Sequence, residues 1–344
     1  MYYHNMKPKK KTKVGRIRQL ATLLCVLPHI VLAQKEVILF HNCENFFYPT
    51  NDSIKDDDEF TINGRKHWTW ARFEKKRDML AKTYIAAGQG EYPAIIGLCE
   101  VEGNKVLDAL CFDSPLRKGG YKYIHYPSQD VRGIDVALLY NESKFKILHS
   151  KQITPQIQST DEPTRDVLYV KGTLNKTFNI NIYVIHAPSR REQNIKQQLR
   201  ENIFTMIKND IDSLRQEGEE NFLVMGDLND NPWDESVVKG LQTEITDTEN
   251  EQYLTNLMQG NQGKTGSYYY GGDLLSFDQF LVSPNFKSKI FYPNQADTTH
   301  IFKPQFLRNN DPRVRLEIPH STYRRFRYAG GVSDHFPIIL HLEI

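Results

Sequence analysis

A cluster of polar residues follows a short apolar run near the middle of the chain. Residues 222–225 are typical of a buried strand that stops at Gly226, and Asp227, Asn229 and Asp230 come directly after it. Alternate side chains of an extended backbone point the same way, so we expect Asp227 and Asn229 to project from one face at the end of the strand. A carboxylate beside an amide can hold a water or a phosphate near a hard cation. A plain Asx-rich turn is the competing interpretation, and partners elsewhere in the chain make it the weaker one.

Three other apolar runs end in polar residues that could join this cluster. The runs at 37–41, 94–99 and 178–185 lead directly to Asn42, Glu100 and His186, respectively. An amide and a carboxylate at the ends of buried strands are what a divalent metal site needs. The histidine is followed closely by Arg190 and Arg191, a combination that suggests contact with an anion. An edge strand ending in a turn, a surface glutamate and a capped connection into the next helix are the structural alternatives.

Two more candidates lie towards the carboxyl end of the chain. Asp278 opens an apolar strand at 278–282. Asp334 and His335 stand between a glycine turn and a final core strand at 336–342. An aspartate beside a histidine, held between a turn and a core strand, is a strong candidate for catalysis.

The rest of the pattern indicates a single domain of mixed strands and helices. Residues 71–87 have helical character, and the residues close to one face are Phe73, Arg77, Leu80 and Tyr84. A second and clearer helix, at 195–214, repeats Ile and Leu at helical spacing and should pack on a sheet. Because no internal repeat and no Gly/Pro/Ser-rich linker divides the chain, one domain is the economical interpretation.

The first 33 of the 344 residues differ from the rest. They carry seven Lys and Arg residues and no acid, and a nearly continuous apolar stretch at 20–32 ends before the small residue Ala33. This is the pattern of a secretory signal peptide cut before Gln34, so we expect residues 1–33 to be a leader and residues 34–344 to be exported to the periplasm or the medium. A membrane anchor is the alternative, but a stretch of this length is short for a span, and we expect no stable one.

Charge gives no general support to the binding of a polyanion. Without the leader, 37 basic residues face 42 acidic ones, a formal charge of −5. One local patch could still meet a polyanion, a basic and aromatic loop between Asp297 and Gly331. Its arginines are Arg308, Arg313, Arg315, Arg324, Arg325 and Arg327. A solvated face is the alternative interpretation of such a charge run.

Three cysteines remain after the leader, namely Cys43, Cys99 and Cys111. An odd number in an exported chain of this size does not form a disulfide framework. Cys43 and Cys99 lie in apolar, strand-like contexts, so we expect buried thiols, with one bridge between these two left open.

Six motifs in a fixed order resemble the endonuclease/exonuclease/phosphatase superfamily, the deoxyribonuclease I-like group, and within it a subgroup of secreted bacterial members. Each motif is weak alone, but the ordered set spans nearly the whole chain after the leader. The motifs are N-x-E-N (42–45), G-L-C-E-V-E (97–102), H-A-P-S-R (186–190), G-D-L-N-D-N-P (226–232), D-Q-F-L-V-S (278–283) and S-D-H-F-P (333–337).

This resemblance implies a fold and a cofactor. The fold is a four-layer α/β sandwich, in which two packed β-sheets are flanked by helices. The cofactor is a divalent cation, Mg²⁺ or Mn²⁺, bound by Asn42 and Glu100, with Asp334 near or in the same shell. Such a cation would neutralise the phosphate and stabilise the charge that develops during cleavage.

The resemblance also implies catalytic roles. Asp227 would position or activate the attacking water, and Asn229 would hold a phosphate oxygen. His335, oriented by Asp278, would act as a general base or as a partner of the phosphate. A carboxylate behind an imidazole fixes its tautomer and raises its basicity, which agrees with this role. His186 would hydrogen-bond the phosphate and could protonate the leaving group.

The leading hypothesis is an exported, metal-dependent phosphoesterase that uses an activated water, in the first place a nuclease or phosphodiesterase acting on DNA or RNA. Arg132 and Arg190 are then expected to contact the substrate. The alternative is a phosphatase, or a phosphodiesterase of lipid or sugar headgroups, acting on a small substrate. A binding module without catalysis is the minor alternative, because unused buried charges are costly to keep. We expect a monomer, and the sequence implies no protein partner.

Overall fold

The structure is a computed structural model that describes residues 1–2, 34–156, 163–190, 193–243, 252–263, 265–293, 299–309 and 315–344. Contacts divide the chain into two units, Met1–Ala33 and Gln34–Ile344. The predicted signal peptide, except for its first two residues, lies outside the described residues, and the fold below is that of the second unit. Among the described residues, no helix combines the length and the apolar character needed to cross a bilayer.

The second unit is built of strands and helices that alternate along the chain. Its strands are β1 (Lys35–Phe46), β2 (Ile95–Val101), β3 (Tyr121–His125), β4 (Asp135–Asn141), β5 (Phe145–Ile153), β6 (Val167–Leu174), β7 (Phe178–His186), β8 (Phe222–Asp227), β9 (Thr255–Asn256), β10 (Tyr268–Tyr270), β11 (Asp273–Leu275), β12 (Asp278–Val282), β13 (Tyr323–Arg324), β14 (Arg327–Tyr328) and β15 (Ile338–Glu343). Its helices are α1 (Trp70–Ala87), α2 (Asn104–Phe112), α3 (Gln193–Gln216), α4 (Glu235–Gly240) and α5 (Pro284–Lys287). Its 3₁₀ turns are η1 (Asp58–Phe60), η2 (Pro115–Gly119), η3 (Gln259–Asn261) and η4 (Gln305–Leu307).

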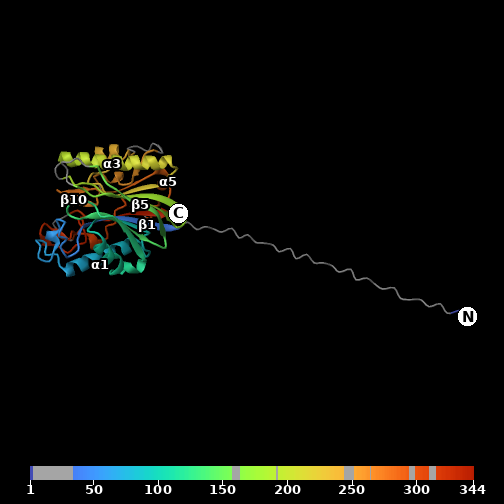
Figure 1. The fold of residues 1–344 in the computed structure, drawn as a ribbon, viewed down its shortest axis with the longest axis horizontal. Coiled ribbons are helices and arrows are strands. Elements are labelled where there is room, and N and C mark those ends of the chain that lie inside the picture. Colours follow the sequence, from blue (N-terminus) through green and yellow to red (C-terminus); the bar gives the residue numbers. More distant parts are fainter. Residues whose placement is uncertain are drawn as a thin grey trace. The chain divides into compact units, whose positions relative to one another are not determined.

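Two sheets form the centre of this unit. The first has the order β15-β1-β2-β4-β3, and the second has the order β5-β6-β7-β8-β12-β9. Within each sheet one central pair is parallel, β1 with β2 and β7 with β8, and the other pairs are antiparallel. Helices α1 and α3 lie on opposite outer sides, with strands of both sheets between them (Figure 1). The predicted four-layer α/β sandwich is confirmed.

The sheets pack closely because small and large residues face each other between them. A Cβ built on Gly97 of β2 would lie 2.7 Å from the Cε atom of Met225 on β8, so a larger residue at this position would require the Met225 side chain to shift. Phe40, from β1, lies beside the same glycine and is fully buried. Burial of side chains of this size stabilises the fold by about 1.5–3 kcal/mol each. The close contact fixes the distance between the strands whose ends carry the polar motifs.

The structure decides two further expectations about the core, one on helix α1 and one on the cysteines. In α1 the residues Phe73, Leu80 and Tyr84 of the predicted face are buried, and Lys76, which the sequence did not single out, is buried beside them. The helix ends at Gly88, as predicted. All three cysteines after the leader are buried and free, which confirms the expected thiols and excludes a bridge between Cys43 and Cys99.

Candidate functional site

Three of the predicted catalytic side chains lie on neighbouring strands of the second sheet. His186 of β7 is the register partner of Asp227 on β8, and Asp227 is in turn the partner of Asp278 on β12. Register partners on adjacent strands point to the same face of a sheet. The three side chains are therefore side by side, although more than 40 residues separate each from the next along the chain.

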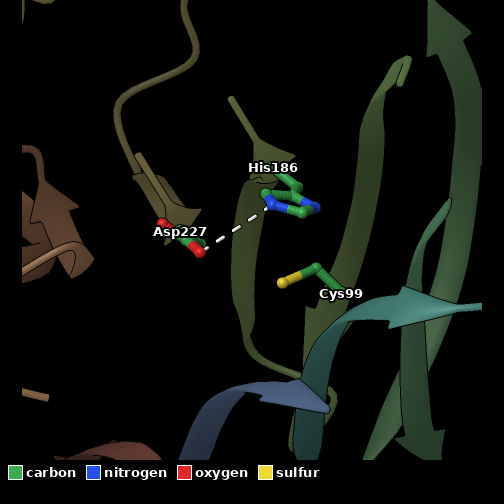
Figure 2. A group of neighbouring side chains, drawn as sticks. All are labelled: Cys99, His186 and Asp227. Atoms are coloured by element: carbon green, nitrogen blue, oxygen red, sulfur yellow. Dashed lines mark ion pairs between the residues drawn. The ribbon is translucent and has the colours of Figure 1, made fainter. Parts of the chain in front are cut away.

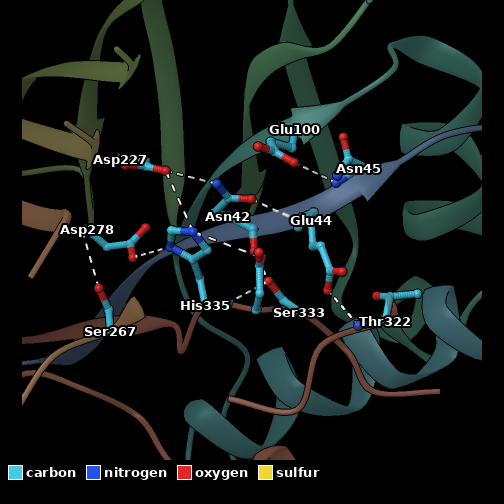
Figure 3. Close-up of polar contacts among 12 residues, drawn as sticks. Asn42, Glu44, Asn45, Glu100, Asp227, Ser267, Asp278, Thr322, Ser333 and His335 are labelled. Carbon is cyan, nitrogen blue, oxygen red and sulfur yellow. Dashed lines mark hydrogen bonds and ion pairs between the residues drawn. The ribbon is translucent and has the colours of Figure 1, made fainter. Parts of the chain in front are cut away.

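The first sheet brings Asn42 and Glu100 to the same place. Nδ2 of Asn42 donates a hydrogen bond of 3.0 Å to Oδ2 of Asp227, which joins the two sheets (Figure 3). Glu100 has a left-handed backbone conformation, with φ of 58°, at an irregularity in the pairing of β2 with β4. Its Oε2 accepts a hydrogen bond of 2.7 Å from the backbone N–H of Asn45. Both side chains thus have orientations fixed by bonds to neighbouring residues.

The last two site residues follow the turn before the final strand. Ser333 donates from Oγ to the carbonyl of Asn42 at 2.7 Å, and the same Oγ accepts from the backbone N–H of His335 at 3.0 Å (Figure 3). These two hydrogen bonds of one serine hydroxyl fix the loop that carries Asp334 and His335 over β1.

His335 is held by a carboxylate on one side and by an aromatic ring on its face. Its Nδ1 lies 2.6 Å from Oδ2 of the fully buried Asp278, and its Nε2 lies 3.9 Å from Oδ2 of Asp227. The ring of Tyr268 stacks on the imidazole, with centroids 4.5 Å apart and an interplanar angle of 18°. Burial lowers the pKa of His335, but the carboxylates of Asp278, Asp227 and Asp334 together outweigh it and raise this pKa well above its usual value. His335 is therefore an imidazolium at neutral pH.

Figure 2 shows His186 beside Asp227 and Cys99. Its Nε2 lies 3.8 Å from Oδ2 of Asp227 and 3.9 Å from Oε1 of Glu100, both beyond hydrogen-bond distance. Its buried Nδ1 has no hydrogen-bond partner among the described residues. Burial, together with the nearby cations Arg165 and Arg132, lowers the pKa of His186 well below its usual value. His186 is thus neutral at neutral pH.

These side chains surround a cavity of about 790 Å³. Nine of the ten predicted site residues line it, namely Asn42, Glu100, Arg132, His186, Arg190, Asp227, Asn229, Asp334 and His335. The tenth, Asp278, lies behind His335 and does not reach the cavity. The structure thus brings together every residue that the sequence predicted for the site.

The geometry expected of Asp227 and Asn229 is wrong in one respect. Strand β8 runs to Asp227 instead of stopping at Gly226, and Asn229 has a left-handed φ of 52°. The alternation of an extended strand therefore does not apply to this pair. The backbone N–H of Asn229 instead donates to Oδ1 of Asp227 at 2.9 Å, and its Nδ2 donates to the carbonyl of Ala187 at 3.0 Å. Asn229 reaches the cavity because this tight turn, and not a strand, positions it.

Arginines line a different part of the cavity wall. Nη1 of Arg165 lies 3.0 Å from Oδ2 of Asp130, and Nη2 donates to the carbonyl of Ala187 at 3.0 Å. Arg132, part-exposed, lies 3.9 Å from the same Asp130. Arg190 stacks over Phe277 with its guanidinium carbon 4.8 Å from the ring centroid. This basic wall faces solvent-filled space beside His186 and can meet an anion.

A model of the endonuclease/exonuclease/phosphatase family matches residues 37–344. The chain belongs to this family. No curated protein matched it. Members of the family are metal-dependent hydrolases of phosphoesters, and the chain is an enzyme of this kind.

Solved structures of the family have the same fold at low identity. A family protein from Bacteroides thetaiotaomicron is 15% identical, with a TM-score of 0.54 and coverage of 91% of this chain and 96% of that one. A mannosyl-6-phosphatase from Bacteroides thetaiotaomicron is 16% identical, with a TM-score of 0.54 and coverage of 89% and 98%. A humanized TDP2 from D. rerio is 15% identical, with a TM-score of 0.52 and coverage of 90% and 99%. At these identities the likeness shows the fold.

The donor set of the site fits the divalent cation that the family uses. Burial and the proximity of other carboxylates raise the pKa of Asp227 and that of Asp334, each to about 6, although His335 acts in the opposite direction on both. A divalent cation relieves this repulsion, and oxygen donors suit Mg²⁺ and Mn²⁺. The thiol of Cys99 lies close to His186 and Asp227 (Figure 2). Burial raises the pKa of Cys99 well above its usual value, so this thiol does not favour a soft metal instead.

The predicted arginine-rich loop is not part of this site. Of its arginines, Arg313 lies outside the described residues, and Arg308, Arg315, Arg324, Arg325 and Arg327 do not line the cavity. The cations of the cavity wall come instead from the turn before β4, the segment before β6 and the segment after β7. A run of like charges in sequence marks a surface, but it does not place that surface at a cavity.

Sequence reasoning missed several residues that support this family's site. Arg165 is isolated in sequence, and its pairing with Asp130 joins segments 35 residues apart. Lys76 donates from Nζ to the carbonyl of Glu44 and, at 2.7 Å, to Oγ1 of Thr322, beneath the loop that carries Asp334. Tyr268 stands in an aromatic run that could have been tied to the site, since Asp278 follows ten residues later. Arg165 and Lys76 gave no local signal in the sequence.

Proposed function

We propose that the protein is an exported phosphoesterase that depends on Mg²⁺ or Mn²⁺ and cleaves phosphodiesters, most of all those of nucleic acid, by attack of water. The observation that carries the proposal is the pair formed by His335 and Asp227 at the base of the cavity. Nε2 of the protonated imidazole lies 3.9 Å from Oδ2 of the carboxylate, whose pKa is raised, and both side chains line the cavity. Such a pair supplies one charged hydrogen-bond donor for a phosphate oxygen and one group that accepts a proton near neutral pH.

Asp227 is the group that accepts the proton of the attacking water. Its pKa of about 6 makes it a stronger base than an exposed aspartate, while it is still largely ionised at neutral pH. Asn42 donates to Oδ2 and the backbone of Asn229 donates to Oδ1, so the carboxylate cannot rotate away from the cavity. The proton leaves the water as its oxygen bonds to phosphorus, and the ester oxygen departs with the electrons of the broken P–O bond.

The two histidines contact the phosphate from different sides. His335 is charged and donates a hydrogen bond from Nε2 to a non-bridging oxygen, where negative charge has to be balanced. His186 is neutral, and its Nε2 faces Asp227 and Glu100 across gaps of 3.8 and 3.9 Å, which leaves room for an oxygen of the substrate. It acts as a hydrogen-bond donor to the phosphate or the leaving oxygen. The low pKa of His186 makes its imidazolium, once formed, a strong acid.

The residues that would hold the divalent cation are Asn42 and Glu100, with Asp334 beside them. The bound cation would supply positive charge to neutralise the phosphate and to polarise a P–O bond. Asn42 uses Nδ2 for Asp227, and its Oδ1 accepts from the backbone N–H of Glu44 at 2.9 Å. A carbonyl oxygen has two lone pairs, so Oδ1 retains one for a cation.

The basic wall favours a second candidate, hydrolysis of a phosphomonoester. A terminal phosphate carries more charge than a diester, and Arg165 and Arg132 beside His186 could balance it. A structural neighbour of this chain bears the name mannosyl-6-phosphatase, which agrees with that candidate. The diester remains the first choice because Thr322 and Tyr323, which precede the cationic segment 324–327, donate to Glu44 between the cavity residues Asn42 and Asn45.

Hydrolysis by the purified chain from Gln34 tests the proposal. The chain and its Asp227→Asn variant would receive single-stranded RNA, supercoiled plasmid, an aryl phosphodiester and a set of sugar and headgroup phosphates, with Mg²⁺ or Mn²⁺. Asp113→Asn, an exposed aspartate at the end of α2, is the matched control. We expect diester cleavage that EDTA stops, that Asp227→Asn abolishes and that Asp113→Asn retains. Turnover of monoesters alone would favour the second candidate, and no turnover with either cation would contradict both.

Export is tested separately. The full-length chain, expressed in a bacterial host, should appear outside the cytoplasm with Gln34 as its first residue. N-terminal sequencing of the released protein measures this directly. Retention of the whole chain with its first residues intact would contradict a cleaved leader.

A further inference from the structure

A cationic surface lies outside the cavity, on the β13–β14 hairpin, the segment that leads into α1 and the first turns of α1. We call it the hairpin surface. Its residues are Arg65, Lys66, Arg72, Lys75, Arg324, Arg325, Phe326, Arg327 and Tyr328. The segments 65–75 and 324–328 hold seven Lys and Arg residues and a single acid, Glu74. One further acid, Glu59, lies 3.6 Å from Arg65, and both side chains are well exposed, so this ion pair screens little of the charge.

Cations and aromatic rings of the two segments interlock. The guanidinium of Arg65 lies 4.3 Å from the ring centroid of Phe326, and the ammonium of Lys66 lies 5.3 Å from the same ring. Arg72 covers Tyr328 at 4.4 Å, and Lys75 lies 5.9 Å from it. Cation–π contacts of this kind hold segments that are more than 240 residues apart in the sequence. The charges are therefore part of an ordered surface.

The hairpin surface is fixed to the rim of the cavity. The backbone N–H groups of Thr322 and Tyr323 donate to the carboxylate of Glu44 at 2.6 and 3.1 Å, as Figure 3 shows for Thr322. Glu44 lies between Asn42 and Asn45, both of which line the cavity. The chain that leaves the hairpin continues within a few residues to Asp334, which also lines it. The hairpin surface is therefore joined directly to residues that neighbour the cavity.

We infer that the hairpin surface binds the phosphate backbone of a nucleic acid strand, one phosphodiester of which occupies the cavity. This inference rests on the proposed function and extends it from the cleaved bond to the polymer that carries it. Lys and Arg side chains at a surface bind such a backbone through charge and release its counterions. An anionic membrane is the other polyanion to consider. The hairpin surface is joined to residues that neighbour a cavity proposed to take a phosphodiester, and the exposed ring of Phe326 among the arginines suits the stacking of bases, which favours a strand over a bilayer.

The test removes the charges at the tip of the hairpin. The variant Arg324→Gln/Arg325→Gln/Arg327→Gln changes three exposed side chains that do not line the cavity. The matched control, Arg117→Gln/Lys118→Gln/Lys287→Gln, removes the same charge from exposed positions on η2 and α5. Binding of fluorescent single-stranded and duplex oligonucleotides would be measured in EDTA against NaCl concentration. Binding to anionic vesicles of phosphatidylglycerol and phosphatidylcholine would be measured alongside.

We expect the hairpin variant to bind oligonucleotide at least about tenfold more weakly at low salt and to lose about one unit of salt slope for each arginine that contacts a phosphate. The control should retain the affinity of the unmodified chain. Equal weakening in the two variants would overturn the inference, because the effect would then be one of net charge. Binding to vesicles but not to oligonucleotides would overturn it in favour of a membrane surface.

Turnover of a small aryl phosphodiester separates this inference from the proposed function. The hairpin variant should keep that activity within about twofold of the unmodified chain, since its substitutions lie outside the cavity. Loss of the activity together with a lowered Tm would overturn the inference by revealing a role of the hairpin in folding. If the unmodified chain hydrolyses no phosphoester, the proposed function fails, and the binding measurements in EDTA still decide whether the hairpin surface holds a strand.

Discussion

The two histidines of the site are chemically identical and lie in one cavity, yet their surroundings put them in opposite states. His335 has the carboxylate of Asp278 at 2.6 Å and is charged. His186 has Arg165 and Arg132 nearby and is neutral. Both are buried, so desolvation acts in the same direction on each, and the neighbouring charges decide the result. A site with one donor already charged and one kept neutral can balance a phosphate without two adjacent positive groups that repel each other.

The contrast between the two histidines shows that the residues around an imidazole are as important for its charge state as the imidazole itself. Asp278 does not reach the cavity, and Arg165 reaches it only at the wall. Asp278 nevertheless favours the charged form of His335, and Arg165 adds to the burial that keeps His186 neutral. Substitution of either supporting residue should therefore reduce the difference in charge between the two histidines.

Asp278→Asn should have the largest effect. The amide cannot stabilise the charged imidazole, so His335 becomes neutral at pH 7 and its orientation is no longer fixed. We expect kcat/KM for an aryl phosphodiester to fall by about 100- to 1,000-fold, the range for loss of a hydrogen-bond donor that stabilises charge in the transition state. Steady-state kinetics measure this, with Tm as a control for folding. A loss smaller than threefold in a folded variant would show that His335 needs no carboxylate behind it.

Arg165→Gln should have the next largest effect, mainly on stability. Arg165 and Asp130 are both buried, at 3.0 Å from each other, and removal of one partner leaves the other charge unpaired. A broken buried pair costs about 3–5 kcal/mol in the free energy of unfolding. Denaturation with urea measures this, and Arg117→Gln, at an exposed position, is the control. A destabilisation below 1 kcal/mol would mean that Asp130 finds another partner.

The pH dependence of stability should show the two histidines acting in opposite directions. The raised pKa of His335 gives stability that is fully present below the pKa of an unfolded histidine, about 6.5, and is lost as pH rises through the folded value. The lowered pKa of His186 costs stability as pH falls below about 6.5, because the unfolded chain then takes up a proton that the fold does not. His186→Gln should reduce the loss of stability between pH 7 and pH 5. An unchanged slope in urea denaturation across this range would contradict the neutral state of His186.

Tyr268→Ala should have the smallest effect. The ring stacked on His335 contributes packing and orientation but no charge, and aromatic pairs add about 0.5–1.5 kcal/mol. A drop of roughly two- to tenfold in kcat/KM is expected, with little change in Tyr268→Phe. If alanine and phenylalanine variants lose activity equally, the hydroxyl and not the stack is what matters.

The sequence was sufficient to predict nine of the polar residues that line the cavity, because polar side chains at the ends of apolar strands are visible in a one-dimensional pattern. The sequence was insufficient to predict residues whose partners come from distant parts of the chain. Arg165 and Lys76 act through partners on distant segments, and nothing local marks them. Asn229 was placed at the site for the wrong reason, since a left-handed turn replaces the expected strand geometry. The hairpin surface was visible as charge, but its partners before α1 and its separation from the cavity depend on the fold.

Direct titration of the histidines tests the central claim of opposite charge states. The protein from Gln34, labelled with ¹⁵N and free of divalent cations, would be followed by NMR of the imidazole nitrogens between pH 5 and pH 8. Assignment would use His186→Gln and His335→Gln. We predict that His335 remains protonated through neutral pH while His186 remains neutral down to pH 5. Two histidines that titrate together near pH 6.5 would contradict the assignment of roles in this site.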